Sequence, residues 1–252
     1  MTMTAESSGT GVGALAVACL ALVLGGAPRA AAQTAEELLD AHAEALGGKD
    51  ALASVKALRR SGATWFDSSF TGRLAGRLEM EIVVGKKVYR SSDMGMFTST
   101  TAWDGESAWE QGPQGLRELA GDELRLIRGS SRPFFSAGLA LPEGAVATRE
   151  EDRDVDGVAH RVVAIDDGEG GRITVLLHPD THLATRVVYR ADLPNLGPTE
   201  IVEERSDYAA HDGILFPGRI QVSVPGIFST ETVFDVTAID PEIDPTRFDA
   251  PR

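Results

Sequence analysis

The feature that most constrains the fold is a long alternation of apolar and charged residues from Arg73 to Val84. The even positions are apolar and most odd positions are charged, as in Leu78-Glu79-Met80-Glu81-Ile82. Because successive side chains of a strand point to opposite faces, this period predicts a half-buried antiparallel strand. A strand of this length with one apolar face is able to curl around a ligand.

Turn signals then recur at short intervals. Asp104-Gly105, Asp156-Gly157 and Asp212-Gly213 each lie between strand-like runs and predict hairpins. Gly168 to Gly171 and Pro179-Asp180 indicate two further turns. Later strands are predicted over residues 158–165, 173–178, 183–190, 200–208, 214–224 and 228–236. We count about eleven strands in order, with no helix between the later ones, which indicates a meander rather than a βαβ fold.

Helical patterns occur at two places. Thr34 and Glu37 form a capping box that begins a helix, and Gly47-Gly48 ends it. Asp50 is predicted to cap a second, shorter helix through Leu52, Val55 and Leu58. Helical spacing over Leu116 to Arg128 predicts a third helix, inserted between strands. We therefore expect one mainly β (α+β) domain over residues 33–252, long enough for a full core.

The N-terminal segment resembles an export signal. Gly11 to Gly26 is apolar but too short to span a bilayer, and Ala30-Ala31-Ala32 offers a cleavage site, so residues 1–32 are interpreted as a Sec-type signal peptide of a periplasmic protein. The residues before this apolar run lack the usual Lys or Arg and include Glu6. Cys19 raises the alternative of a lipid anchor, but Ala16 stands where such signals usually have Leu, and this alternative is less favoured.

Composition excludes some partners. The formal net charge of −14 argues against nucleic acid, because phosphate binding needs a basic surface. It also argues against electrostatic docking on anionic lipid. With Cys19 the only cysteine, the mature chain has no disulfide or thiolate site, and no cofactor is expected.

Large apolar side chains are the candidates to line a cavity, with an ordinary core as the alternative for each. The candidates are Trp65, Met80, Ile82, Phe97, Trp103, Trp109, Phe134 and Phe135. Phe134 and Phe135 are adjacent, and two neighbouring residues of a strand cannot face the same core. One of them is therefore expected to be exposed unless a ligand or a helix covers it. Because the pair lies beside Pro133 and between glycines, we interpret it as part of a hinged lid.

Two motifs suggest chemistry and are set aside. His178 and His182 flank a carboxylate, Asp180, but they surround a turn instead of sharing one helical face, so no metal site is predicted. Gly105-Glu106-Ser107 begins like a nucleophile elbow, but it lacks the final glycine and has no recognisable histidine partner. We therefore expect no catalytic residues and no enzyme.

The order of these elements resembles the outer-membrane lipoprotein-sorting family with the LolA/LolB-like fold. The resemblance covers nearly the whole mature chain and rests on four segments: AEALGGKDALASVKALRRSG, then TTAWDGESAWEQ at Thr100 to Gln111, RSDYAAHDGILFPGRIQV from Arg205, and Pro245-Thr246-Arg247-Phe248. It implies a curved, incomplete antiparallel β-barrel whose open side is covered by helices. In the family, the cavity holds acyl chains of lipoproteins or related lipids.

Two functions follow as hypotheses. The first is a non-catalytic, monomeric periplasmic carrier or binding protein for lipid or lipoprotein acyl chains, with an envelope protein as a further possible partner. The second is an envelope scaffold or interaction module of the same fold, with a filled core and no lipid cargo.

Overall fold

The computed structural model describes residues 33–139, 141–193 and 196–251. The chain from Gln33 onward forms one compact unit. The expected signal peptide, residues 1–32, and Cys19 within it lie outside the described residues.

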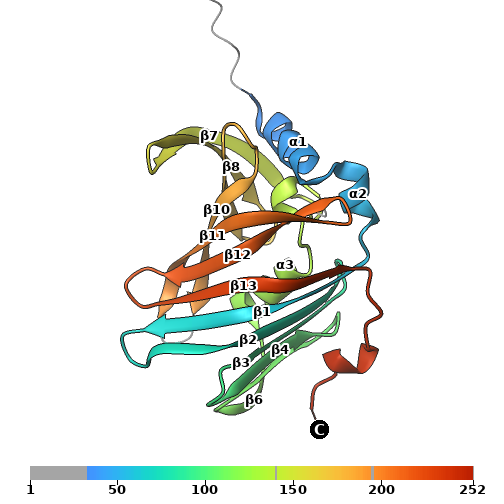
Figure 1. Cartoon of the computed structure of the whole chain (residues 1–252), viewed down its shortest axis with the longest axis vertical. Coiled ribbons are helices and arrows are strands. Elements are labelled where there is room, and N and C mark those ends of the chain that lie inside the picture. Colours follow the sequence, from blue (N-terminus) through green and yellow to red (C-terminus); the bar gives the residue numbers. More distant parts are fainter. Residues whose placement is uncertain (1–32, 140, 194–195, 252) are drawn as a thin grey trace, which may run out of the picture. The chain divides into compact units, whose positions relative to one another are not determined.

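Thirteen strands form one sheet in which every neighbouring pair is antiparallel. Their order across the sheet is β6-β5-β4-β3-β2-β1-β13-β12-β11-β10-β9-β8-β7, so the first and last strands pair in the middle and the sheet is not closed (Figure 1). The strands are β1 (Ala57–Ser68), β2 (Gly72–Val83), β3 (Lys87–Asp93), β4 (Thr98–Trp103), β5 (Ala108–Gly112), β6 (Gly115–Glu118), β7 (Val146–Val155), β8 (Val158–Asp166), β9 (Arg172–Leu177), β10 (Ala184–Leu193), β11 (Gly197–His211), β12 (Ile214–Val224) and β13 (Phe228–Ile239).

The helices confirm the first prediction and correct the other two. In α1 (Ala35–Leu46), the Thr34 side chain caps the backbone of Glu37, and both halves of the capping box are present. The second helix, α2 (Lys49–Ser54), is shorter than predicted, because Leu58 already belongs to β1. Its N-cap is Gly48 and not the predicted Asp50, so the helix has no side-chain cap. The third, α3 (Gly121–Ser130), begins later than predicted, because residues 115–118 pair with β5 as strand β6. Two 3₁₀ turns, η1 (Phe135–Ala137) and η2 (Pro245–Phe248), complete the elements.

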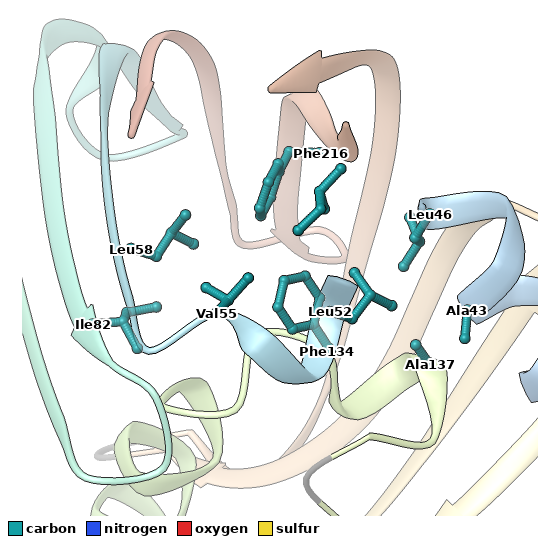
Figure 2. Close-up of a cluster of buried hydrophobic side chains, with 10 residues drawn as sticks. Ala43, Leu46, Leu52, Val55, Leu58, Ile82, Phe134, Ala137 and Phe216 are labelled. Carbon is teal, nitrogen blue, oxygen red and sulfur yellow. The ribbon is translucent and has the colours of Figure 1, made fainter. Parts of the chain in front are cut away.

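The pairing of residues between neighbouring strands shows which face of the sheet the helices cover. Leu58 of β1 pairs with Ile82 of β2, which pairs with Val88 of β3, so these side chains share one face. Figure 2 shows Leu58 and Ile82 on the sheet, with Leu52 of α2 and Phe134 packed between the sheet and α1. We call this helix-covered side the inner face, and the opposite side the outer face.

Helix α3 shows that the sheet curves around the inner face. It contacts β3 and β4 on one side and β10 on the other. Five strands, β2, β1, β13, β12 and β11, separate these two sides in the sheet order. Strands so far apart can touch one short helix only if the sheet bends around it, so the architecture is an open, curved antiparallel sheet with its helices on the inner face.

Candidate functional site

Three of the predicted cavity residues lie on the inner face of the sheet. Ile82 is buried in the cluster of Figure 2, and Met80 packs partly buried against it. Trp103 pairs with Val88 and is buried beside Ile127 of α3. Its indole nitrogen is buried without a hydrogen-bond partner among the described residues.

The two adjacent phenylalanines lie in the segment after α3, and they separate as expected for neighbouring residues. Phe134 is buried in the cluster of Figure 2 and its ring lies 5.8 Å from that of Phe216. Phe135 packs partly buried against a second cluster that includes Leu39 of α1 and Val163 of β8. This segment therefore inserts between α1 and the sheet.

Three other candidates lie away from the inner face, which corrects their expected position. Trp65 pairs with Glu231 on the outer face, where the Arg73 guanidinium carbon lies 5.6 Å from its ring centre. Trp109 also faces outward, and its indole donates to the Phe248 carbonyl at 2.9 Å, beneath η2. Phe97 lies in the β3–β4 turn. The sequence pattern predicted no strand at the positions of β1 and β5, so only the packing shows which of their faces meets the helices.

A cluster of three arginines on the inner face was missed by sequence reasoning. Arg60 of β1 pairs with Met80, and Met80 pairs with Arg90 of β3, so all three share the inner face. Arg205 of β11 pairs with Ile220 of β12, Ile220 pairs with Thr232 of β13, and Thr232 pairs with Thr64 of β1. Thr64 lies four residues after Arg60 in the same strand, so Arg205 also faces inward. We call Arg60, Arg90 and Arg205 the arginine cluster.

Arg60 is buried, with 4% of its surface exposed. It donates to the Pro217 carbonyl at 2.5 Å and to the Thr237 hydroxyl at 3.2 Å, and its guanidinium carbon lies 3.5 Å from the centre of the Phe234 ring. No carboxylate of the described residues lies within ion-pair distance. Burial, and then the charge of Arg205, lowers the pKa of Arg60 to about 10. A buried cation without an anionic partner is costly, so this position favours an incoming anion.

Arg205 links the sheet to the segment after α3. Its Nε donates to Glu203 at 2.6 Å, and another guanidinium nitrogen donates to the Ser136 hydroxyl in η1 at 3.2 Å. Burial acts to lower the pKa of Arg205, but Glu203 and Tyr208 outweigh it and the pKa is raised. Arg205 therefore stays charged in its half-buried position.

Arg90 differs from the other two because its residue is exposed. No ion pair or side-chain hydrogen bond joins it to another described residue. Burial lowers its pKa, while Tyr189 of β10 and Glu203 of β11 act to raise it. Tyr189 and Glu203, on the far side of the curved sheet, thus act on the Arg90 side chain, which still reaches solvent.

The arginine cluster has an excess of positive charge and apolar neighbours. Glu203 is the one carboxylate that acts on all three arginines. Burial raises the pKa of Tyr189 to about 12, so its phenol remains neutral. On the same face, the rings of Phe66 and Phe228 lie 5.6 Å apart, and both are only half-buried. Arg60 itself stacks on the half-buried ring of Phe234, and a cationic face that also carries incompletely covered aromatic rings suits a ligand with an acidic head and an apolar tail.

Solved structures share this arrangement of sheet and helices. A LolA superfamily protein from Nitrosomonas europaea superposes with a TM-score of 0.59 at 9% identity, over 87% of this chain and 99% of that one. The chain has the LolA-like fold. A DUF1329 family protein from Desulfovibrio piger gives a TM-score of 0.55 at 12% identity, covering 84% and 95% of the two chains. A putative outer membrane lipoprotein-sorting protein domain from Vibrio parahaemolyticus gives 0.52 at 12% identity, covering 85% and 97%.

The LolA-like fold confirms the fold class and the resemblance expected from the sequence. The predicted count of about eleven strands was low by two, since the sheet has 13. No family model matches the sequence, and no curated protein matches it either. Among the described helices, none combines the length and apolar character needed to cross a membrane.

Two depressions mark the surface of this LolA-like domain, and neither is an enclosed apolar cavity. One, of about 660 Å³, lies beside the start of α3 and is lined by Ala120, Gly121, Asp122, Glu123, Asp192, Leu193 and Gly197. The other, of about 260 Å³, is lined by Arg59, Arg60, Ser61, Glu79, Glu81 and Arg247.

The histidines of the β9–β10 turn serve the turn itself. The Nδ1 atom of His178 accepts from the backbone amides of Asp180 at 3.2 Å and Thr181 at 3.4 Å. Its ring meets that of His160 edge-on, with centres 5.6 Å apart. Within the described residues, no group of three or more metal-ligating side chains comes together.

Proposed function

We propose that the protein is a non-catalytic envelope carrier or binding protein that takes up an acyl chain on its inner face. The observation that carries this proposal is the arginine cluster on the concave side of the sheet, where Arg60 stacks on the half-buried ring of Phe234. We propose further that the acidic head group of the ligand, a carboxylate or phosphate, meets these arginines. The lipoprotein-sorting domain named among the similar structures supports an acyl chain as the cargo.

Physical magnitudes favour this assignment. Burying an acyl chain stabilises the complex by roughly 0.8 kcal/mol per CH₂, so no covalent step is needed to hold it. A charge-assisted hydrogen bond adds about 1.5–3 kcal/mol where a buried cation lacks a partner. Arg60 is such a cation, since it has only neutral acceptors among the described residues.

Uptake requires α3 and the segment through η1 to move away from the sheet. Arg205 holds η1 through Ser136, and the same guanidinium is available to an anionic ligand. An acidic head group that competes for Arg205 weakens this contact and thus favours opening. An envelope partner that binds the displaced segment would drive release. Phe134 and Phe135 remain proposed ligand contacts in this open state, together with Met80, Ile82 and Trp103.

The second candidate is an interaction module whose interior remains filled. The specific observation in its favour is that neither surface depression is an enclosed apolar cavity. The two candidates differ in what the purified protein carries. A carrier retains lipid that solvent extraction and mass spectrometry detect, whereas a filled module retains none.

A binding experiment tests the head-group assignment. We compare a fluorescent long-chain fatty acid with its methyl ester, using the unchanged protein, Arg90→Gln and the control Arg73→Gln on the outer face. Arg90 is suited to this because it is exposed and makes no hydrogen bond that the fold needs. We expect Arg90→Gln to weaken acid binding about tenfold and to leave ester binding unchanged. Equal loss for acid and ester would reject the head-group role, and no binding of either would reject the carrier function.

A further inference from the structure

The turns between strands lie in two rows, one at each end of the strands. We call these two rows the edges of the sheet, and they differ in chemistry. Because all neighbouring strands are antiparallel, successive turns alternate between the two edges. One edge holds the turns at residues 69–71, 94–97, 113–114, 167–171 and 225–227, together with the β10–β11 connection, of which Leu196 is described. The other edge holds those at residues 84–86, 104–107, 156–157, 178–183 and 212–213.

Charge separates the two edges. Every turn of the second edge contains a charged residue, and in four of the five it includes an aspartate: Asp104, Asp156, Asp180 and Asp212. On the first edge, five of the six turns contain no Asp, Glu, Lys or Arg. The exception is the β8–β9 turn, where Asp167 and Glu169 pair with Arg125 and Arg128 of α3.

Exposed apolar side chains collect on the same uncharged edge. Phe70 is 89% exposed and Met96 80% exposed, each in a turn of this edge. We define the apolar rim as Phe70, Met96, Phe97, Leu196 and Leu116, the last of which lies in β6 just after its turn. Among the described residues there are two other exposed large apolar side chains. Val146 begins β7 at this edge, and Val236 lies within β13.

The uncharged turns are consecutive along the edge. In sheet order they join β5–β6, β3–β4, β1–β2, β12–β13 and β10–β11, so they belong to ten adjacent strands. The turns of β1–β2 and β12–β13 lie together at the left of Figure 1. The charged β8–β9 turn lies beyond this run, towards the other end of the sheet.

We propose that the apolar rim docks on the surface of a lipid bilayer. Neighbouring turns are about two strand spacings, or roughly 10 Å, apart, so their side chains project singly. Protein interfaces need a continuous packed core, whereas each isolated Phe, Met or Leu can enter a fluid bilayer without a matching pocket. The five turns themselves carry no charged side chain, so their apolar residues reach a lipid surface ahead of nearby acidic residues such as Asp67 and Asp93, near the ends of β1 and β3.

This inference does not depend on the proposed cargo, since it concerns the edge of the sheet rather than its inner face. The binding is apolar rather than electrostatic. It should therefore persist on neutral phosphatidylcholine vesicles and in high salt.

Vesicle sedimentation tests the rim. The full chain is mixed with phosphatidylcholine vesicles and compared with Phe70→Ser/Met96→Ser and with Val236→Ser, each in the same background so that residues 1–32 contribute equally. Val236 is the matched control because it is 43% exposed but lies outside the rim. We expect the double variant to partition at least about tenfold more weakly, and the control to match the unchanged protein. Equal partitioning of all three would overturn the proposal.

A local probe separates rim contact from any other membrane contact of the chain. Phe70→Trp should show a blue-shifted emission and quenching by brominated lipid when vesicles are added, after subtraction of the signal of the three native tryptophans. Val236→Trp should show neither change. If Trp at position 70 stays in water, the rim does not dock on lipid.

Discussion

His42 shows at the residue scale how burial changes an ordinary side chain. It lies on the buried side of α1 with 1% of its surface exposed. Its Nδ1 donates to the His182 carbonyl at 2.8 Å, while its Nε2 is buried without a partner among the described residues. Burial, and then the charge of Arg205, lowers the pKa of His42 from 6.5 to about 4. The imidazole is therefore neutral in the folded protein at neutral pH.

This shift predicts a pH dependence of stability. Between about pH 6.5 and 4 the unfolded chain binds a proton at His42 that the folded protein does not. The stabilisation that comes from keeping His42 neutral should therefore be fully present above pH 6.5. The free energy of unfolding should fall by up to about 3 kcal/mol as the pH drops towards 4. Urea unfolding across this range measures the slope. His42→Gln keeps a donor for His182 but does not titrate, so its slope should be flatter; an identical slope would contradict this account.

The site residues show why the arginine cluster escaped sequence reasoning. Arg60 stands in the run Leu58-Arg59-Arg60-Ser61, where nothing marks it as the buried one of two arginines. Arg59 faces outward and pairs with Glu81, while Arg60 faces the helices. Arg90 and Arg205 also look like ordinary polar positions of strands. Only the curvature of the sheet brings charges from β1, β3 and β11 towards one another.

At the scale of elements, α3 bridges the two sides of the curved sheet. Ile127 and Leu124 pack against the cluster that includes Val88 and Trp103. Leu126 packs instead against the cluster of Ala191, Ile201 and Val224. A helix held on two sides by few apolar contacts is a suitable lid, because each side can be released separately.

We expect Leu126→Ala to loosen α3 without unfolding the sheet. Loss of this half-buried side chain should destabilise the contact with the β10–β13 side by about 1–2 kcal/mol. The backbone amides of α3 should then exchange hydrogen about tenfold faster, while those of β11 to β13 keep their protection. Arg128→Ala is the control, since its exposed pair with Glu169 contributes little. Hydrogen-exchange mass spectrometry would contradict the lid role if α3 and the sheet lost protection together.

At the scale of the whole molecule, the last strand of the chain joins the two halves of the open sheet in its middle. Strand β13 pairs with β1 along its length, from Leu58 opposite Ile239 to Ser68 opposite Phe228. Asp240, directly after β13, accepts the backbone amides of Lys56 and Ala57. The two halves of the sheet are thus joined only when the C-terminal strand is present.

Truncation tests this dependence. A chain that ends at Gly226 lacks β13 and should show no cooperative unfolding, because its two half-sheets lose their shared strand. A chain that ends at Asp240 lacks η2 and the buried Phe248, and should fold with stability reduced by about 2–3 kcal/mol. Circular dichroism and urea titration measure both. Cooperative unfolding of the shorter chain would show that the sheet does not depend on this central pairing.

The sequence by itself determined the local structure of this protein. The alternation in β2, the capping box of α1 and the Asp-Gly turns are properties of neighbouring residues, and all three are present in the fold. Only the tertiary structure decided which face of each strand meets the helices, that residues 115–118 join the sheet, and that three arginines share the inner face. The reason is that a period of two fixes which side chains lie together, but not which side is buried; burial depends on contacts between residues far apart in the chain.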